Sequence, residues 1–280
     1  GETWDFIVSG ISTSDFTRVI RQDPKNPNVL YSGTETGVYI SFNQGESWHS
    51  ISLNLPTVPV TGLIVEERDL VISTHGRSFW ILDDIETLRQ INPTLKYSQD
   101  HLFKPSNAIR RAVPAVIDYH IESGDREIKL DILDSAGRHV KTLLEKNSQS
   151  PGFYRETWDL RYPGAVTFSG IVLEGGNPAI GPWAPPGMFQ VQLTIGNQQI
   201  TEQFQVQKDP RLTNISKDDL LAQHNLALNI RNHESSANQH VIAIRDLKSQ
   251  IQDRTANSRD RQLNVIASLF TEKISQIEGQ

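Results

Sequence analysis

Asp83 and Asp84 come nearest, among the residues of this chain, to the paired carboxylates of an enzyme. Glycoside hydrolysis needs two carboxyl groups about 5–10 Å apart on either side of the scissile bond. Adjacent residues on a strand point to opposite faces, and adjacent residues in a turn bond nearby backbone N–H groups instead. We therefore predict that these two aspartates cap a turn, and we predict no catalytic residue.

Arg18, Arg21 and Arg77 lie on or beside predicted strands. Arginines that faced a common channel would bind a carboxylate, because a guanidinium group donates two parallel hydrogen bonds to its oxygens. The same residues also form salt bridges that hold a fold together, and we favour this structural role.

Histidines and aspartates show no metal-ligand spacing. His75 has no histidine or carboxylate two or four residues further on, and His224 and His233 are too far apart to share a helix face. Turn capping is favoured over a weak Ca²⁺ site for three aspartates, Asp131, Asp134 and Asp159. We predict no metal and no cofactor.

The composition narrows the class of partner. The chain has 280 residues, no cysteine and a net charge of −6. Without cysteine there is no disulfide, thiol nucleophile or Cys-ligated zinc. The negative charge argues against binding to nucleic acid, and the basic pair Arg110 and Arg111 is predicted to be a solvated charge in a linker. No apolar run of about 18 residues is present, so we expect no membrane-spanning helix.

Residues 41–48 (SFNQGESW) predict a tight hairpin turn. Asn43 bonds its own backbone and Gly45 adopts positive φ without steric cost. The hydroxyls of Ser41 and Ser47 tie the ends of the turn together, and Trp48 places a large apolar ring beneath it. The run GETW at residues 1–4 repeats GESW at 45–48, and tryptophans recur at Trp4, Trp48 and Trp80. We expect all three rings to lie in a core.

The turn resembles the Asp-box, S/T-x-D-x-G-x-S/T-W, of neuraminidase-type repeats, with Asn43 at the Asp position. Short predicted strands separated by turns surround it. With YSGTETGVY at 31–39 and STHGRSFWILDD at 73–84, residues 1–104 resemble the closing blades of bacterial sortilin-like β-propeller proteins, often labelled glycosyl hydrolases. The resemblance implies an incomplete ring of four-stranded blades. A sialidase would need an arginine trio and a tyrosine from blades outside this chain.

Residues 105–210 predict an immunoglobulin-like β-sandwich from six alternating strand candidates. ILDSAGRHV at 132–140 and PGMFQV at 186–191 are similar to the immunoglobulin-like domain of the flagellar hook-capping protein. A Pro/Gly-rich insert at 162–187 departs from that domain. Within it, Trp183 is either exposed, as a contact for a carbohydrate or a protein partner, or packed over its own sandwich.

Residues 211–280 predict a hairpin of two amphipathic helices. Ser216 and Asp219 form a capping box at the start, and Asn257 with Ser258 marks the break. The apolar positions of the second helix include Leu263, Ile266 and Phe270. Because two helices cannot bury both apolar faces alone, we expect a partner here, and we expect that the hairpin is truncated.

The sequence thus predicts a mainly β chain with a C-terminal α segment. The expected function is a non-catalytic interaction or scaffold module of a secreted or periplasmic bacterial β-propeller protein that binds protein or carbohydrate. One alternative is an accessory region of a glycoside hydrolase whose catalytic carboxylates lie in upstream blades. Another is a structural subunit of a cell-envelope assembly.

Overall fold

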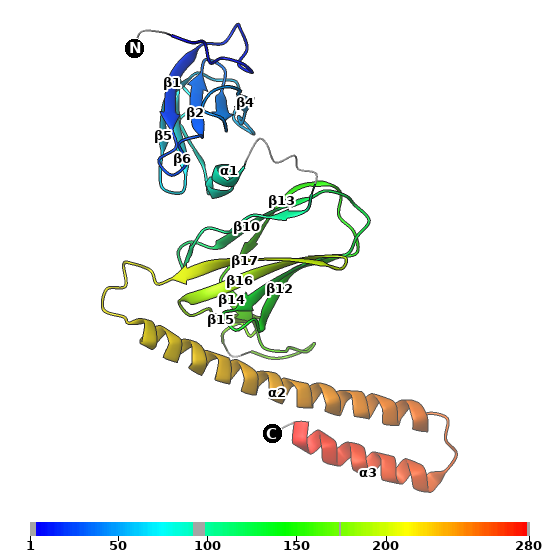
Figure 1. Cartoon of the computed structure of the whole chain (residues 1–280). Helices are drawn as coiled ribbons and strands as arrows, with labels where there is room; N and C mark the ends of the chain where they lie inside the picture. The colour runs from blue at the N-terminus through cyan, green and yellow to red at the C-terminus, as the bar shows by residue number, and fades with distance from the viewer. Residues whose placement is uncertain (1–3, 92–98, 174, 279–280) are drawn as a thin grey trace. The chain divides into compact units, whose positions relative to one another are not determined.

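The computed structural model describes residues 4–91, 99–173 and 175–278. The fold is mainly β with a C-terminal helical segment, as predicted (Figure 1). The chain divides into two compact units. The first comprises Gly1–Ala108, Ala115–Trp158 and Met188–Gln205, and the second comprises Ile109–Pro114, Asp159–Gly187 and Val206–Gln280. The domain boundaries at residues 104 and 210 stay predictions.

The first unit begins with a four-stranded antiparallel meander whose strands pair in chain order. Its strands are β1 (Thr17–Gln22), β2 (Leu30–Thr34), β3 (Val38–Ser41) and β4 (His49–Ser50). Asp23 closes the first turn, because its Oδ1 accepts hydrogen bonds from the backbone N–H groups of Lys25 and Asn26 at 2.8 and 3.0 Å. The four strands predicted here are confirmed.

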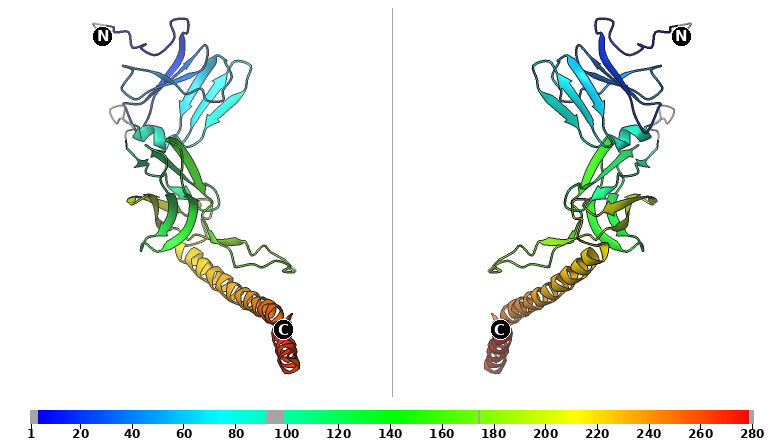
Figure 2. Two further views of the ribbon diagram at one scale, coloured as in Figure 1. Left: turned by 90° about the vertical axis from the view of Figure 1, so that its right-hand side faces the viewer. Right: turned by 90° about the vertical axis from the view of Figure 1, so that its left-hand side faces the viewer.

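A three-stranded sheet packs against this meander. Its strands are β5 (Val60–Val65), β6 (Leu70–Thr74) and β7 (Phe79–Leu82), followed by the short helix α1 (Glu86–Gln90). The two sheets lie side by side in both views of Figure 2. Gly33 on β2 permits this approach, since a Cβ there would lie 2.6 Å from Cγ1 of Val60. The buried residues between the sheets are Val19, Val29, Tyr31, Val38, Ile40, Val60, Leu63, Leu70, Ile72 and Ile85.

Two further sheets form the sandwich, with strand orders β13-β10-β8 and β12-β11-β16-β17-β9. Their strands are β8 (His101–Leu102), β9 (Ala108–Ile109), β10 (Ala115–Ile121), β11 (Ile128–Asp134), β12 (His139–Lys146), β13 (Gly152–Trp158), β16 (Gly187–Ile195) and β17 (Gln198–Gln207). The Trp158 ring lies 5.2 Å from that of Phe189 and 6.1 Å from that of Phe204, which places it between the sheets. The six predicted strands are confirmed, and sequence reasoning missed β8 and β9.

The second unit contains a hairpin that begins one residue before the predicted insert at 162–187 and ends within it. Its strands are β14 (Arg161–Pro163) and β15 (Ile180–Trp183). The two backbones approach so closely that a Cβ on Gly181 would lie 1.8 Å from the carbonyl oxygen of Tyr162. Position 181 therefore requires glycine, because any side chain there would clash with the opposite strand.

Two helices complete the second unit, α2 (Lys217–Thr255) and α3 (Arg261–Glu278). The predicted capping box is confirmed, with Ser216 Oγ accepting from the Asp219 N–H at 3.0 Å and Asp219 Oδ2 accepting from the Ser216 N–H at 2.9 Å. The chain reverses after Thr255 and α3 returns along α2 (Figure 1). Across the described residues, neither of these helices nor any other is sufficiently long and apolar to cross a membrane.

Candidate functional site

The second unit holds α2 against its β-hairpin through side chains that reach backbone groups. Asn238 Nδ2 donates to the carbonyl oxygen of Val166 at 2.6 Å, and Arg231 Nη1 donates to that of Pro163 at 3.0 Å. The Val166 N–H donates to Ser235 Oγ at 3.1 Å. These bonds occur on one face of α2 and fix the helix that carries α3.

Helix α3 packs on α2 through Ile274 and through small and polar residues. The positions that lose exposure are Asn264, Ala267, Thr271, Ile274 and Glu278. Ile274 is the most enclosed of them, at 8% exposure. At the end of the helix Glu278 Oε1 accepts from Arg245 Nε at 2.7 Å, and its Oε2 forms a second ion pair with Lys248. Hydrogen bonds from Lys248 and Arg245 lower the pKa of Glu278, which favours the charged carboxylate in these two ion pairs.

The large apolar residues of α3 other than Ile274 remain exposed. Four of them form a stripe along the helix, which we call the α3 stripe: Leu263 (45% exposed), Ile266 (64%), Phe270 (46%) and Ile277 (64%). At 3.6 residues per turn the stripe lies about a quarter turn from the face that contacts α2. Exposed Val265 and Leu269 widen it. The structure therefore places Leu263, Ile266 and Phe270 together and in solvent.

Trp183 is half-buried on β15 rather than exposed in a loop. The guanidinium carbons of Arg161 and Arg111 lie over its ring, 3.8 and 5.7 Å from the centroid. Its carbonyl oxygen accepts a hydrogen bond from His224 Nδ1 at 2.8 Å. Burial lowers the pKa of His224, which favours the neutral ring that makes this bond. Trp183 lies in a different part of the fold from the α3 stripe, and its role as a partner contact stays a prediction.

The turn at residues 41–48 is closed on itself. Ser41 Oγ accepts from the Gly45 N–H at 2.8 Å, Asn43 Oδ1 accepts from the Ser47 N–H at 3.0 Å, and Asn43 Nδ2 donates to Ser47 Oγ at 3.0 Å. Gly45 has a φ of +96°. Trp48 is 4% exposed, and its Nε1 donates to the carbonyl oxygen of Ile7 at 2.7 Å. The polar groups of the turn form hydrogen bonds with one another, so these residues stabilise the turn itself.

The expected burial of three recurring tryptophans is wrong for one of them. Trp80 is half-buried against the core between the sheets, but Trp4 is 93% exposed. Trp4 lies outside any strand, and the preceding three residues of its GETW run are outside the described residues. Without a strand to carry it, Trp4 has no sheet to pack against.

The expectation that Arg110 is a solvated linker charge is also wrong, because its side chain is 3% exposed. Sequence reasoning further missed Arg89, which lies buried beside Asp23. Asp84 caps the turn as predicted, because its Oδ1 accepts from the Glu86 N–H at 3.3 Å. It is 7% exposed, and it also accepts from Ser106 Oγ at 2.7 Å and forms an ion pair with Arg68 at 2.8 Å.

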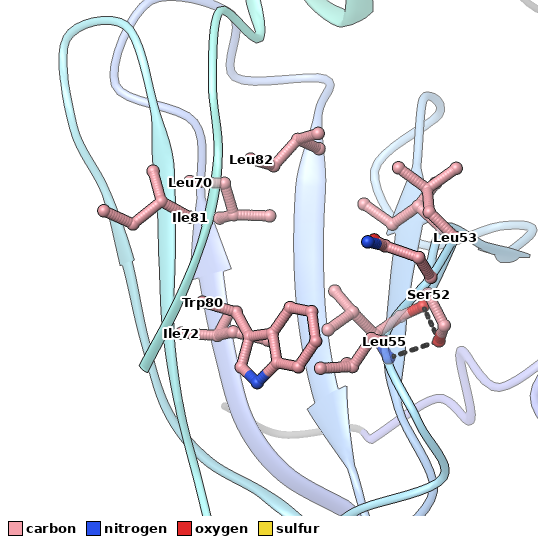
Figure 3. A pocket seen from close by; sticks show the side chains of 11 residues that line it. Ser52, Leu53, Leu55, Leu70, Ile72, Trp80, Ile81 and Leu82 are labelled. Carbon is pink, nitrogen blue, oxygen red and sulfur yellow. Dashed lines mark hydrogen bonds between the residues drawn. The ribbon is translucent and has the colours of Figure 1, made fainter. Parts of the chain in front are cut away.

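One cavity lies within the first unit, between residues 51–55 and strands β6 and β7 (Figure 3). Trp80, Leu55 and Ile72 point into it, so its walls are mainly apolar. Its volume of about 60 Å³ is well below the roughly 300–1,000 Å³ of ligand pockets. Among the described residues, no group of three or more His, Cys, Asp or Glu side chains could hold a metal ion.

The chain was compared with known proteins. No known protein family and no curated protein matches the sequence. Among solved structures, the extracellular domain of a hybrid two-component system from B. thetaiotaomicron aligns over 72% of this chain, with 10% identity and a TM-score of 0.23. The chain spans 27% of the length of that structure.

Proposed function

We propose that this chain is a non-catalytic interaction module that binds a helix of a protein partner on the α3 stripe. The observation that carries the proposal is that α3 packs on α2 through Ile274 and small or polar residues, while the four apolar residues of its α3 stripe stay in solvent. A helix that turns its apolar side outward is stabilised when another apolar surface covers it. Anchors spaced three, four and seven residues apart are those of helix-in-groove recognition.

The charge on the stripe specifies the partner further. Lys273 is exposed and forms no ion pair with a described residue. Viewed down the helix axis, its direction falls between those of Ile266 and Leu269. Residues 263–277 extend about 21 Å at 1.5 Å per residue. We therefore commit to an amphipathic helix of at least that length with a carboxylate opposite Lys273.

The kinship that we propose is with the sortilin-like propeller proteins, and the secreted or periplasmic location rests on the same resemblance. Support comes from the four-stranded meander with its closed turn at residues 41–48 and from the neighbouring sheet. On the outer face of that sheet Phe79 and Ile81 are 75% and 60% exposed, although β7 is apolar on both faces. Strands apolar on both faces are typical of sheets that are covered on both sides.

A titration tests the helix-binding proposal. The full chain is titrated with a synthetic amphipathic helix of about 20 residues, long enough to be helical in water, that carries one glutamate at the position facing Lys273. We expect saturable binding to the natural chain and at least about tenfold weaker binding to the Leu263→Asp, Ile266→Asp double variant.

The matched control is the Gln239→Asp, Gln250→Asp variant, which adds the same two charges at exposed polar positions of α2. Control and natural chain should bind equally. Equal binding by the Leu263→Asp, Ile266→Asp variant, or no binding by the natural chain, would refute the proposal.

A further inference from the structure

The three-stranded sheet of the first unit has an open edge. Its strands pair in the order β5-β6-β7, whereas the neighbouring meander carries a fourth strand, β4, beside β3. Among the described residues, no strand pairs with the far side of β7. Natural proteins protect such edges with prolines, charges or bulges, because the unpaired N–H and C=O groups can bind another chain. β7 has the sequence FWIL and pairs with β6 without a bulge, so it lacks these protections.

The backbone groups of Phe79 and Ile81 face this open edge. In an antiparallel pair, residues that bond the neighbouring strand alternate with residues whose N–H and C=O groups point away from it. The Thr74 N–H donates to the carbonyl oxygen of Ser78 at 3.2 Å, so Ser78 bonds toward β6. The pairing continues without a break, so Trp80 also bonds β6 and the residues on either side of it do not. Phe79 and Ile81 therefore each offer one donor and one acceptor to a further strand.

The side chains of β7 alternate between the core and solvent. Trp80 and Leu82 point toward residues 51–55, and Ile81 points away from them (Figure 3). Phe79 and Ile81 are 75% and 60% exposed. The outer face of this edge is thus apolar and uncovered, which leaves side chains as well as backbone groups for a contact.

A charged residue flanks each end of β7. Arg77 precedes the strand and Asp83 follows it; both are exposed, and neither forms an ion pair with a described residue. When two strands run antiparallel, the start of one lies beside the end of the other. Two copies of β7 therefore bring Arg77 of each chain near Asp83 of the other, whereas parallel copies would place like charges together. Charge complementarity favours a second copy of this chain in the antiparallel direction.

The same arrangement pairs the free backbone groups. A two-fold axis at Trp80 places Phe79 of each copy opposite Ile81 of the other. Both residues present outward N–H and C=O groups, so each pair exchanges two hydrogen bonds. The two Trp80 residues then face each other as a non-hydrogen-bonded pair, in which side chains lie closest and aromatic contacts are favourable.

We propose that two copies of this chain associate through antiparallel pairing of their β7 edges, which joins the two three-stranded sheets into one continuous sheet. The association goes beyond the helix-binding role of the α3 stripe, since it uses none of its residues. The edge is only four residues long, and interfaces that bury less than about 1,200 Å² are typical of weak, transient complexes. The dimer should therefore form as the protein concentration rises.

Sedimentation velocity of the full chain at increasing concentration tests the association. We expect the sedimentation coefficient to rise from that of a monomer toward that of a dimer. The Leu263→Asp, Ile266→Asp variant, in which the α3 stripe is disrupted, should dimerise like the natural chain. A natural chain that stays monomeric overturns the proposal, and so does loss of the dimer in this variant, which would assign the association to α3.

Charge variants make the test specific to β7. Arg77→Asp and Asp83→Arg each place like charges together at both ends of the paired strands, and each should weaken dimerisation about fivefold or more. An equimolar mixture of the two variants should associate like the natural chain, because every arginine then lies near an aspartate. Arg254→Asp makes the same change of charge at the exposed end of α2 and should have no effect. A mixture that associates no better than its components would contradict the assignment.

Amide hydrogen exchange locates the contact within the dimer. The N–H groups of Phe79 and Ile81 should exchange more slowly at concentrations at which the dimer forms, because they gain acceptors from the second copy. If neither amide slows while the dimer is populated, the two copies meet elsewhere and the proposal is wrong.

Discussion

Arg89 on α1 and Asp23 in the turn after β1 form an ion pair of 2.9 Å between Nε and Oδ2, with side-chain exposures of 3% and 0%. The pair joins residues that are 66 positions apart in the chain. Arg89 also donates to the carbonyl oxygens of Glu67 and Glu66 at 2.6 and 3.1 Å, which lie beyond β5. One guanidinium group therefore connects the β1–β4 sheet and the β5–β7 sheet to α1, the helix that follows them.

We predict that Arg89→Met lowers the free energy of unfolding of the first unit by about 3–5 kcal/mol, because it leaves Asp23 buried without a counter-charge. Urea denaturation followed by tryptophan fluorescence measures this change. Arg77→Met is the control, since Arg77 is exposed and forms no ion pair with a described residue. A loss no larger than that of the control would show that the pair does not stabilise this unit.

Asn43→Ala should lower the free energy of unfolding by about 1–2 kcal/mol, because it removes the acceptor of the Ser47 N–H and a donor to the Ser47 hydroxyl. Asn43→Asp keeps the acceptor, and the Ser47 hydroxyl can then donate to the carboxylate. We expect it to retain most of the stability. The same denaturation measurement compares the two, and equal losses would indicate that the side-chain network of the turn is unimportant.

Local patterns predicted much of this fold. Residues within a few positions of one another are sufficient to predict three of its features. These are the strands of the first meander that have alternating or apolar character, the Ser216 capping box and the reversal after Thr255. The features that the sequence did not predict depend on contacts between segments that are distant in the sequence. The burial of Arg89 and Arg110 depends on acceptors from distant residues, which are 23, 66 and 67 for Arg89 and 184 and 223 for Arg110.

The candidate site was only half predictable for the same reason. Helical spacing identified the apolar positions of α3, but the sequence could not state which face contacts α2. Ion pairs from Arg245 and Lys248 to Glu278 help to select the polar face. The expected core position of Trp4 was wrong because its GETW run repeats a sequence motif without the strand that would carry it.

Asp209 provides a prediction about pH. Hydrogen bonds from the side chain and the backbone N–H of Arg211 lower the pKa of Asp209 from 3.8 to about 2. The folded pKa is below the ordinary value, so the interaction is fully present above pH 3.8 and is lost as the pH falls through 2. Carboxyl ¹³C shifts should report this value. In Arg211→Gln the pKa should return toward 3.8, while in Lys208→Gln it should stay low; a pKa near 3.8 in the natural chain would contradict the structure.

Shortening a side chain to alanine should destabilise the hairpin on the face of α3 that contacts α2, and should have little effect on the exposed face. Ile274→Ala removes a side chain that is 8% exposed against α2 and should cost about 2 kcal/mol or more of hairpin stability. Ile266→Ala removes one that is 64% exposed and should change stability by less than about 0.5 kcal/mol. Hydrogen exchange of the α3 amides measures both. A larger loss at Ile266 would mean that the packing face has been assigned incorrectly.

The most direct test of the interaction role is amide hydrogen exchange of the full chain with and without the synthetic amphipathic helix. A helix that covers the α3 stripe suppresses local opening there. Exchange should therefore slow across residues 263–277 and stay unchanged in β1–β4. If exchange of residues 263–277 is the same with saturating peptide, or slows only elsewhere in the chain, the α3 stripe is not the binding face.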